Sequence, residues 1–167
     1  MPKGRGIPEV PMNLNNWQRT EPVSLFVSDG ETEQEYRLTF GTCSNFDIGL
    51  FNRRRGRVFE SMRATYGDDW IRNDEAIVMQ GVMIAHAMVM AALKRVEVKD
   101  GDTWTETKLP DAWYDAERFA REVPAGMMDV LTDAVIDAGN PARLFSFIPS
   151  GDEEKKVLRL TVQPSKN

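Results

Sequence analysis

The chain has 167 residues and a net charge of −5 at neutral pH; 41% of its residues are hydrophobic and 28% are charged. This size and composition predict one soluble domain with a core of its own. The acidic balance disfavours wholesale binding to nucleic acid or to an anionic membrane surface. Cys43 is the single cysteine, so no disulfide within the chain is expected, and a reducing cytosol is the predicted environment.

Residues 1–22 are predicted to form an irregular N-terminal arm, because prolines, glycines and asparagines recur in them. They lack the apolar central region of a signal peptide, so a secreted role is not expected. A β-hairpin follows. Residues 23–28 (VSLFVS) read as a strand, Asp29-Gly30 is a turn signal, and residues 35–40 (EYRLTF) alternate between apolar and polar.

Residues 44–66 are predicted to be helical in parts. Ser44, with Asp47 three residues later, has the pattern of a helix cap, and Gly67-Asp68-Asp69 breaks the segment. The segment carries a basic cluster: Arg53, Arg54, Arg55, Arg57 and Arg63. Three roles fit this cluster: binding of phosphates, contact with an acidic protein surface, or a solvated face of the helix. The acidic chain disfavours the first of these, so nucleic acid is not an expected partner.

The most hydrophobic stretch is residues 74–96, predicted to be one long helix. From Ala76 to Leu93 each residue is apolar or small except Gln80 and His86. Asp74 and Glu75 at one end, and Lys94 and Arg95 at the other, are expected to complement the helix dipole.

A helix that is apolar on nearly all sides is either buried or in lipid. A membrane span needs about 20 apolar residues, whereas this stretch has 18 and includes a Gln and a His. A central helix of a core or of a subunit interface is therefore favoured, and a membrane location is the lesser alternative. Methionines suit such adaptable packing surfaces; they are Met79, Met83, Met88 and Met90.

A second hairpin is predicted from residues 95–99 (RVEVK) and 103–108 (TWTETK), joined at Asp100-Gly101. Two amphipathic helices follow, over Asp111–Glu122 and from Pro124 to Ala138, and Gly139-Asn140-Pro141 is a stop signal. The fold class is thus α+β: a mainly α-helical single domain over residues 23–141, with a central apolar helix and two short β-hairpins. Residues 142–167 form a C-terminal tail, with an apolar patch at 143–148 and a short strand at 156–162.

No catalytic, metal-binding or cofactor-binding set is predicted. His86 has no carboxylate three or four residues away, so a hydrogen-bonded core or interface histidine is favoured over a ligand or a base. Cys43 lies in no nucleophile motif and is expected to be structural. The acidic pairs Asp68-Asp69 and Asp74-Glu75 lack EF-hand spacing, and no phosphate-binding glycine motif occurs.

The order of elements, together with the text VEVKDGDTWTETKLP and AERFAREVPAGMMDVLTDAVIDAGNP, resembles the tail assembly chaperones of long-tailed bacteriophages. The resemblance is one of pattern and covers roughly residues 22–141; the N-terminal arm and the tail after Pro141 have no counterpart in it. It implies a non-enzymatic protein of the host cytoplasm that coats the tape-measure protein while the tail tube polymerises. In that family a longer form is often made by frameshifting.

The expected partners are therefore phage proteins, namely the tape-measure and tail-tube proteins, and further copies of the chain. The alternative is a structural virion component, such as a head–tail connector or tail-terminator subunit. The residues predicted to bind partners are Met83, Ile84, Met88, Arg53, Arg54, Arg55, Phe145 and Phe147.

Overall fold

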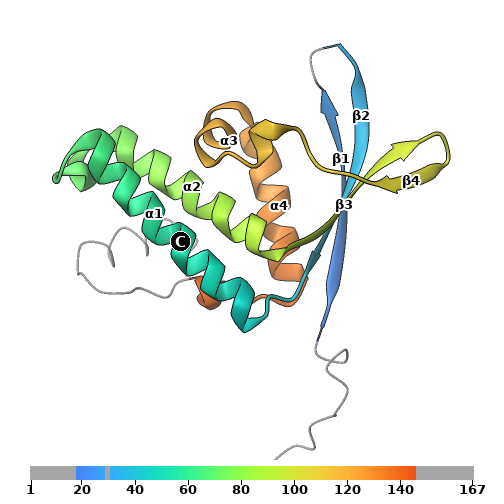
Figure 1. Cartoon of the computed structure of the whole chain (residues 1–167), viewed down its shortest axis with the longest axis horizontal. Helices are drawn as coiled ribbons and strands as arrows, with labels where there is room; N and C mark the ends of the chain where they lie inside the picture. Colours follow the sequence, from blue (N-terminus) through green and yellow to red (C-terminus); the bar gives the residue numbers. More distant parts are fainter. Residues whose placement is uncertain (1–17, 29–30, 146–167) are drawn as a thin grey trace, which may run out of the picture.

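The computed structural model describes residues 18–28 and 31–145. It confirms the α+β class, with four helices and one four-stranded antiparallel sheet in a single domain (Figure 1). The Asp29-Gly30 turn, most of the predicted N-terminal arm, and the tail beyond Phe145, including Phe147 and the predicted strand, lie outside the described residues.

The sheet is built from both predicted hairpins. Its strands are β1 (Thr20–Ser28), β2 (Glu33–Gly41), β3 (Leu93–Asp100) and β4 (Thr103–Glu106), in the order β1-β2-β3-β4. Pairing of β2 with β3 joins the hairpins, with Leu38 opposite Val96 and Tyr36 opposite Val98. The two hairpins were predicted separately. They form one sheet because the pairing of β2 with β3 puts the apolar residues of both strands on the same face.

Alternation along the strands separates the two faces of the sheet. Leu38 and Phe40 of β2 are fully buried, as expected for the apolar set of a half-covered strand. Arg37, one residue before Leu38, belongs to the other face, where its Nε donates to Glu97 Oε1 at 2.9 Å and its guanidinium lies 4.4 Å from the centroid of the Trp104 ring. The hydrogen bond from Arg37 holds the pKa of Glu97 below its usual range.

Helix α1 (Asn45–Tyr66) is continuous rather than helical in parts. Ser44 and Asp47 form the predicted capping box, and Gly67, at φ +90°, ends the helix. Two internal glycines, Gly49 and Gly56, each cost about 1 kcal/mol relative to alanine. Burial of apolar side chains offsets this cost; these are Phe51, Val58, Phe59 and Met62.

Helix α2 (Asp74–Ala92) is the predicted central helix, capped by Asn73 Oδ1, which accepts from the Ala76 N–H at 3.1 Å. The prediction was wrong about its end. Lys94 and Arg95 lie in β3 and not in a last helical turn. Lys94 Nζ pairs with Asp47 Oδ2 at 2.6 Å, which fixes the start of the strand beside the start of α1.

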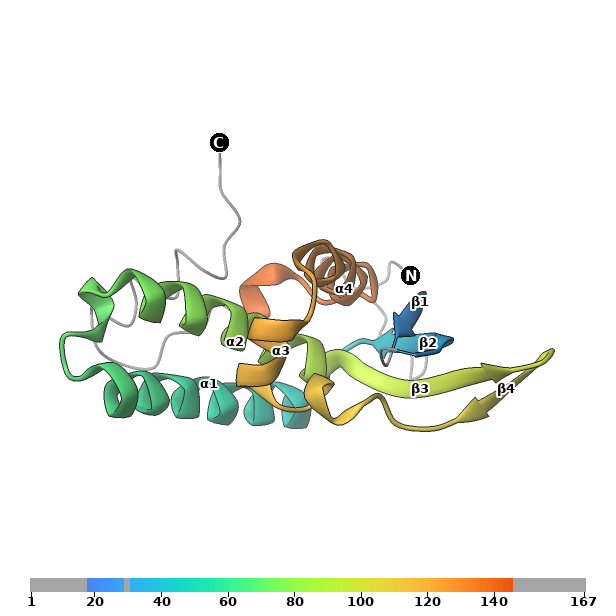
Figure 2. The same ribbon diagram turned by 90° about the horizontal axis from the view of Figure 1, so that it is seen from above.

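α2 lies between α1 and α4 (Ala125–Asp137), with α3 (Ala116–Glu122) packed against it as well (Figure 2). Within the described residues it is the one helix whose length and hydropathy would allow it to cross a membrane; its mean hydropathy is 1.5 and 61% of the stretch is buried. The helix is apolar on most sides because three helices cover it.

The segment between the sheet and α4 differs from its prediction. Asp111–Glu122 is a 3₁₀ turn, η3 (Asp111–Trp113), followed by α3, which Asp115 caps by accepting from two backbone N–H groups. Pro124 stands just before the first turn of α4 rather than in it. Gly139, at φ +90°, follows the end of α4 as predicted, and a 3₁₀ turn, η4 (Ala142–Phe145), comes after it.

Candidate functional site

Five of the eight predicted partner-binding residues line two hollows on either side of α2; they are Arg54, Met83, Ile84, Met88 and Phe145. We call the first the α1–α2 groove; α1, α2 and the segment leading into α3 enclose it, and its volume is about 680 Å³. Its floor is apolar, formed by Val58, Met83, Ala87, Met90 and Leu93. Two methionines in this floor allow it to adapt to differently shaped ligands.

The polar lining of the α1–α2 groove is basic. Arg54, Arg57 and Ser61 lie along one side of α1, and no carboxylate lines the groove among the described residues. Arg54 Nη1 is buried there without a hydrogen-bond partner in the described part of the chain. Positions i, i+3 and i+7 share one face of a helix, so this row follows from the spacing of the three residues.

His86 and Tyr114 complete the polar lining of this groove. His86 Nε2 lies 2.7 Å from the Trp113 carbonyl oxygen, so Nε2 carries the proton and donates. Burial lowers the pKa of His86, with a smaller lowering from the charge of Arg54 and an opposing contribution from the Trp113 hydrogen bond. The prediction of a hydrogen-bonded core histidine is confirmed, and the ring is neutral at pH 7.

The second hollow, the α2–α4 groove, has a volume of about 370 Å³. Ile84, Met88 and Phe145 line it, together with Asp129 and Asp133 of α4. Phe145 is fully buried and packs edge-on against Phe51, with ring centroids 5.0 Å apart. This groove is therefore apolar at its base and acidic along α4, opposite in charge to the α1–α2 groove.

Four of the predicted partner-binding residues are buried, and one of them is Met83, which is 9% exposed. The other three, Arg55, Ile84 and Phe145, are at most 1% exposed. Arg55 is one position from Arg54, and a rotation of about 100° between helical neighbours turns it away from the α1–α2 groove. Arg53 is exposed but lines neither groove, whereas Met88 is partly exposed in the second.

Sequence reasoning missed two residues of the α1–α2 groove. Arg57 belonged to the basic cluster, and its helical spacing from Arg54 was a signal that it shares that side. Tyr114 gave no such signal, because the turn at η3 brings it there. Large apolar residues exposed elsewhere were also missed; they are Phe26, Phe46, Val78, Val130 and Ile136.

Comparison with protein-family models, with curated proteins and with solved structures found no match for this chain. The assignment of function therefore rests on its residues and their geometry.

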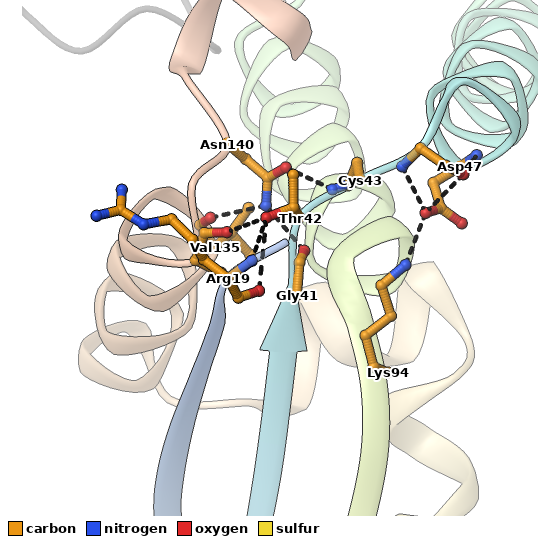
Figure 3. Close-up of polar contacts among 10 residues, drawn as sticks. Arg19, Gly41, Thr42, Cys43, Asp47, Lys94, Val135 and Asn140 are labelled. Carbon is orange, nitrogen blue, oxygen red and sulfur yellow. Dashed lines mark hydrogen bonds and ion pairs between the residues drawn. The ribbon is translucent and has the colours of Figure 1, made fainter. Parts of the chain in front are cut away.

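Cys43 lies in a structural junction rather than in a reactive site (Figure 3). Its backbone N–H donates to Asn140 Oδ1 at 2.7 Å, and Asn140 Nδ2 donates to the carbonyl oxygens of Gly41 and Val135. Burial and the nearby Asp47 raise the pKa of the thiol to about 11, against a smaller opposing effect of Lys94. The thiol is therefore protonated at neutral pH.

The acidic pair Asp68-Asp69, before α2, and the acidic pair Asp74-Glu75, in its first turn, have exposed side chains. Glu75 accepts a hydrogen bond from the Tyr66 hydroxyl at 2.7 Å and lies 3.8 Å from Arg121. Among the described residues, no three His, Cys, Asp or Glu side chains are grouped to hold a metal ion.

Proposed function

We propose that this chain is a non-enzymatic tail assembly chaperone of a long-tailed bacteriophage, which binds the tape-measure protein in the host cytoplasm while the tail tube polymerises. The resemblance of residues 22–141 supports the family. The observation that carries the binding role is the α1–α2 groove, which combines a methionine-containing floor with arginines that no carboxylate of the described groove lining neutralises. Such a surface is suited to a protein segment.

The dimensions of the grooves fit this role. A hollow of about 680 Å³ beside one of about 370 Å³ provides space for side chains of a client helix on both sides of α2. Charges of opposite sign in the two grooves offer the client a defined orientation. The same opposite charges suit contacts between copies of the chain, so a homo-oligomer is part of this proposal.

A structural virion component is the second candidate, and one observation favours it. β1 has nine residues, and its outer edge pairs with no other strand in the described residues. A free edge of this length is a template for a strand of a neighbouring subunit, as a ring of subunits requires. Pro22, which cannot donate a backbone hydrogen bond, limits the pairing near one end of this edge.

Co-expression with the tape-measure protein of the same phage tests the proposal. We expect the pair to co-purify and the tape-measure protein to gain solubility, while a tape-measure protein of an unrelated phage, co-expressed with the chain, provides a specificity control. If the tape-measure protein neither associates nor gains solubility, the chaperone assignment is wrong. Mass spectrometry of purified particles separates the two candidates, because a chaperone leaves before the particle is complete and a connector stays.

A further inference from the structure

The basic lining of the α1–α2 groove has no counter-charge among the described residues of the groove. Arg54 and Arg57 face it from α1, and the described residues place no carboxylate in its lining. We propose that this groove binds an acidic amphipathic helix of a protein partner, whose carboxylates pair with Arg54 and Arg57 and whose apolar side chains lie on Met83 and Met90. This inference specifies the client segment and rests on the proposed function.

Arg54 is only partly buried, and the burial of one of its nitrogens argues for a carboxylate ligand. Its Nη1 atom is removed from water and makes no hydrogen bond among the described residues. A buried donor without an acceptor is unfavourable, so the arrival of an acceptor there gains more than it would at a solvated arginine. The planar guanidinium matches a carboxylate in a two-bond geometry, which favours this ligand over a neutral amide.

The spacing along α1 argues for a helix. Arg54 and Arg57 are three residues apart, which is a rise of roughly 4.5 Å along the helix axis. Carboxylates three or four residues apart on a partner helix lying along α1 have nearly the same separation. The apolar floor between α1 and α2 then receives the adjoining apolar face of that helix, in the helix-in-groove mode of recognition.

The floor and the total charge argue against a polyphosphate or nucleic-acid ligand. Aliphatic and methionine side chains form the floor, and they offer no stacking platform of the kind on which bases bind. Tyr114 is the one exposed aromatic side chain in the described lining. The chain carries a net charge of −5, which repels a polyanion. A short acidic segment carries fewer charges than a polyanion and is therefore repelled less. Its apolar face also contacts the floor while its carboxylates contact the arginines.

Three synthetic 18-residue helical peptides with blocked ends test the proposal on the full chain. All share leucines at helical spacing; the first has glutamates three and four residues apart beside them, the second has glutamines there, and the third lysines. We expect the glutamate peptide to bind and the glutamine peptide to bind roughly a hundredfold more weakly, because each of the two charge-assisted pairs contributes a factor of about ten. The lysine peptide should not bind.

Substitutions locate the binding. Arg54→Met and Arg57→Met should each weaken the glutamate peptide roughly tenfold, and raising the salt concentration should weaken it in the wild type more than in the variants. Arg53→Met, an exposed neighbour outside the groove, is the matched control and should change the affinity less than twofold. Arg54→Met should not lower the thermal midpoint, because it removes a buried donor that lacks an acceptor. The ring signals of His86, the single histidine, should shift during the titration.

Equal binding of the three peptides, or an equal effect of Arg53→Met and Arg54→Met, would overturn the proposal. So would displacement of the glutamate peptide by a 12-nucleotide single-stranded DNA at matched charge, which would assign the groove to phosphates. Repeating the co-expression with the Arg54→Met, Arg57→Met double variant separates this inference from the proposed function. Equal binding of the tape-measure protein by the wild type and the double variant refutes the groove proposal but leaves the chaperone assignment in place. If the glutamate peptide binds and the tape-measure protein fails to bind, the chaperone assignment is refuted and the groove proposal is kept.

Discussion

Replacing Asn140 with alanine leaves three backbone groups without their hydrogen-bond partner at the junction of β2, α1 and α4. These groups are the Cys43 N–H, at 2.7 Å from Asn140 Oδ1, and the carbonyl oxygens of Gly41 and Val135, at 3.0 and 2.9 Å from Nδ2 (Figure 3). Asn140 is fully buried, and each buried polar group left unpaired costs about 1–3 kcal/mol. Because Cys43 is only partly buried, we expect a total loss of about 3–5 kcal/mol.

This loss is large beside the 5–15 kcal/mol that stabilises a typical domain, and it should lower the thermal midpoint by roughly 10–20 °C. Urea unfolding followed by circular dichroism measures it. Asn45→Ala, at an exposed asparagine of the first turn of α1, is the control and should cost under about 0.5 kcal/mol. A loss under about 1 kcal/mol for Asn140→Ala would mean that water replaces the amide at little cost, and the junction would not hold these elements together.

Three further predictions concern single side chains. The pKa of His86 is lowered in the folded state, so the unfolded chain binds a proton more readily than the folded chain. The free energy of unfolding should therefore be constant above about pH 6.5 and fall as the pH drops below that value. Urea midpoints between about pH 5 and 7.5 measure this dependence, which should be lost in His86→Gln. With the pKa of Cys43 raised to about 11, its alkylation rate should still be rising at about pH 10, whereas a plateau near pH 8.5, the value of a free thiol, would contradict the burial argument. Ile84→Asp, at a position 1% exposed, should prevent folding, whereas Val78→Asp, 67% exposed, should leave the thermal midpoint within a few degrees; equal effects would mean that α2 is packed differently.

Local patterns were sufficient to predict most elements of this fold. The alternating stretches with an Asp-Gly turn gave the strands, and the Ser44–Asp47 spacing gave the start of α1, because turn and cap geometry depends on neighbouring residues only. The pairing of β2 with β3 joins residues about 60 positions apart, and no local signal encodes it. The end of α2 was mispredicted for the same reason, since the ion pair of Lys94 with Asp47 is a distant contact.

The candidate site was predictable only in part. Helical spacing places Arg54 and Arg57 together, but it does not say which side of α1 faces a groove and which faces the core. The structure assigns Arg55 to the buried side and Arg54 to the groove. Phe145 was expected to bind a partner because it belongs to the apolar patch at the start of the predicted tail; instead it packs in the core against Phe51.

The two polar residues in the apolar part of α2 explain why this helix is not amphipathic in the usual sense. Gln80 and His86 are buried, at 0% and 6% exposure, whereas Val78 is 67% exposed and Met88 partly so. Their buried positions place hydrogen-bonding groups inside, as the contact of His86 with Trp113 illustrates. Polar side chains at exposed positions of a helix cost little stability, so folding alone does not require apolar residues there. An apolar residue at one such position is ordinary, but here apolar side chains of α2 line a hollow on each of two sides. Contact with another protein accounts for this arrangement directly, since that contact removes these side chains from water.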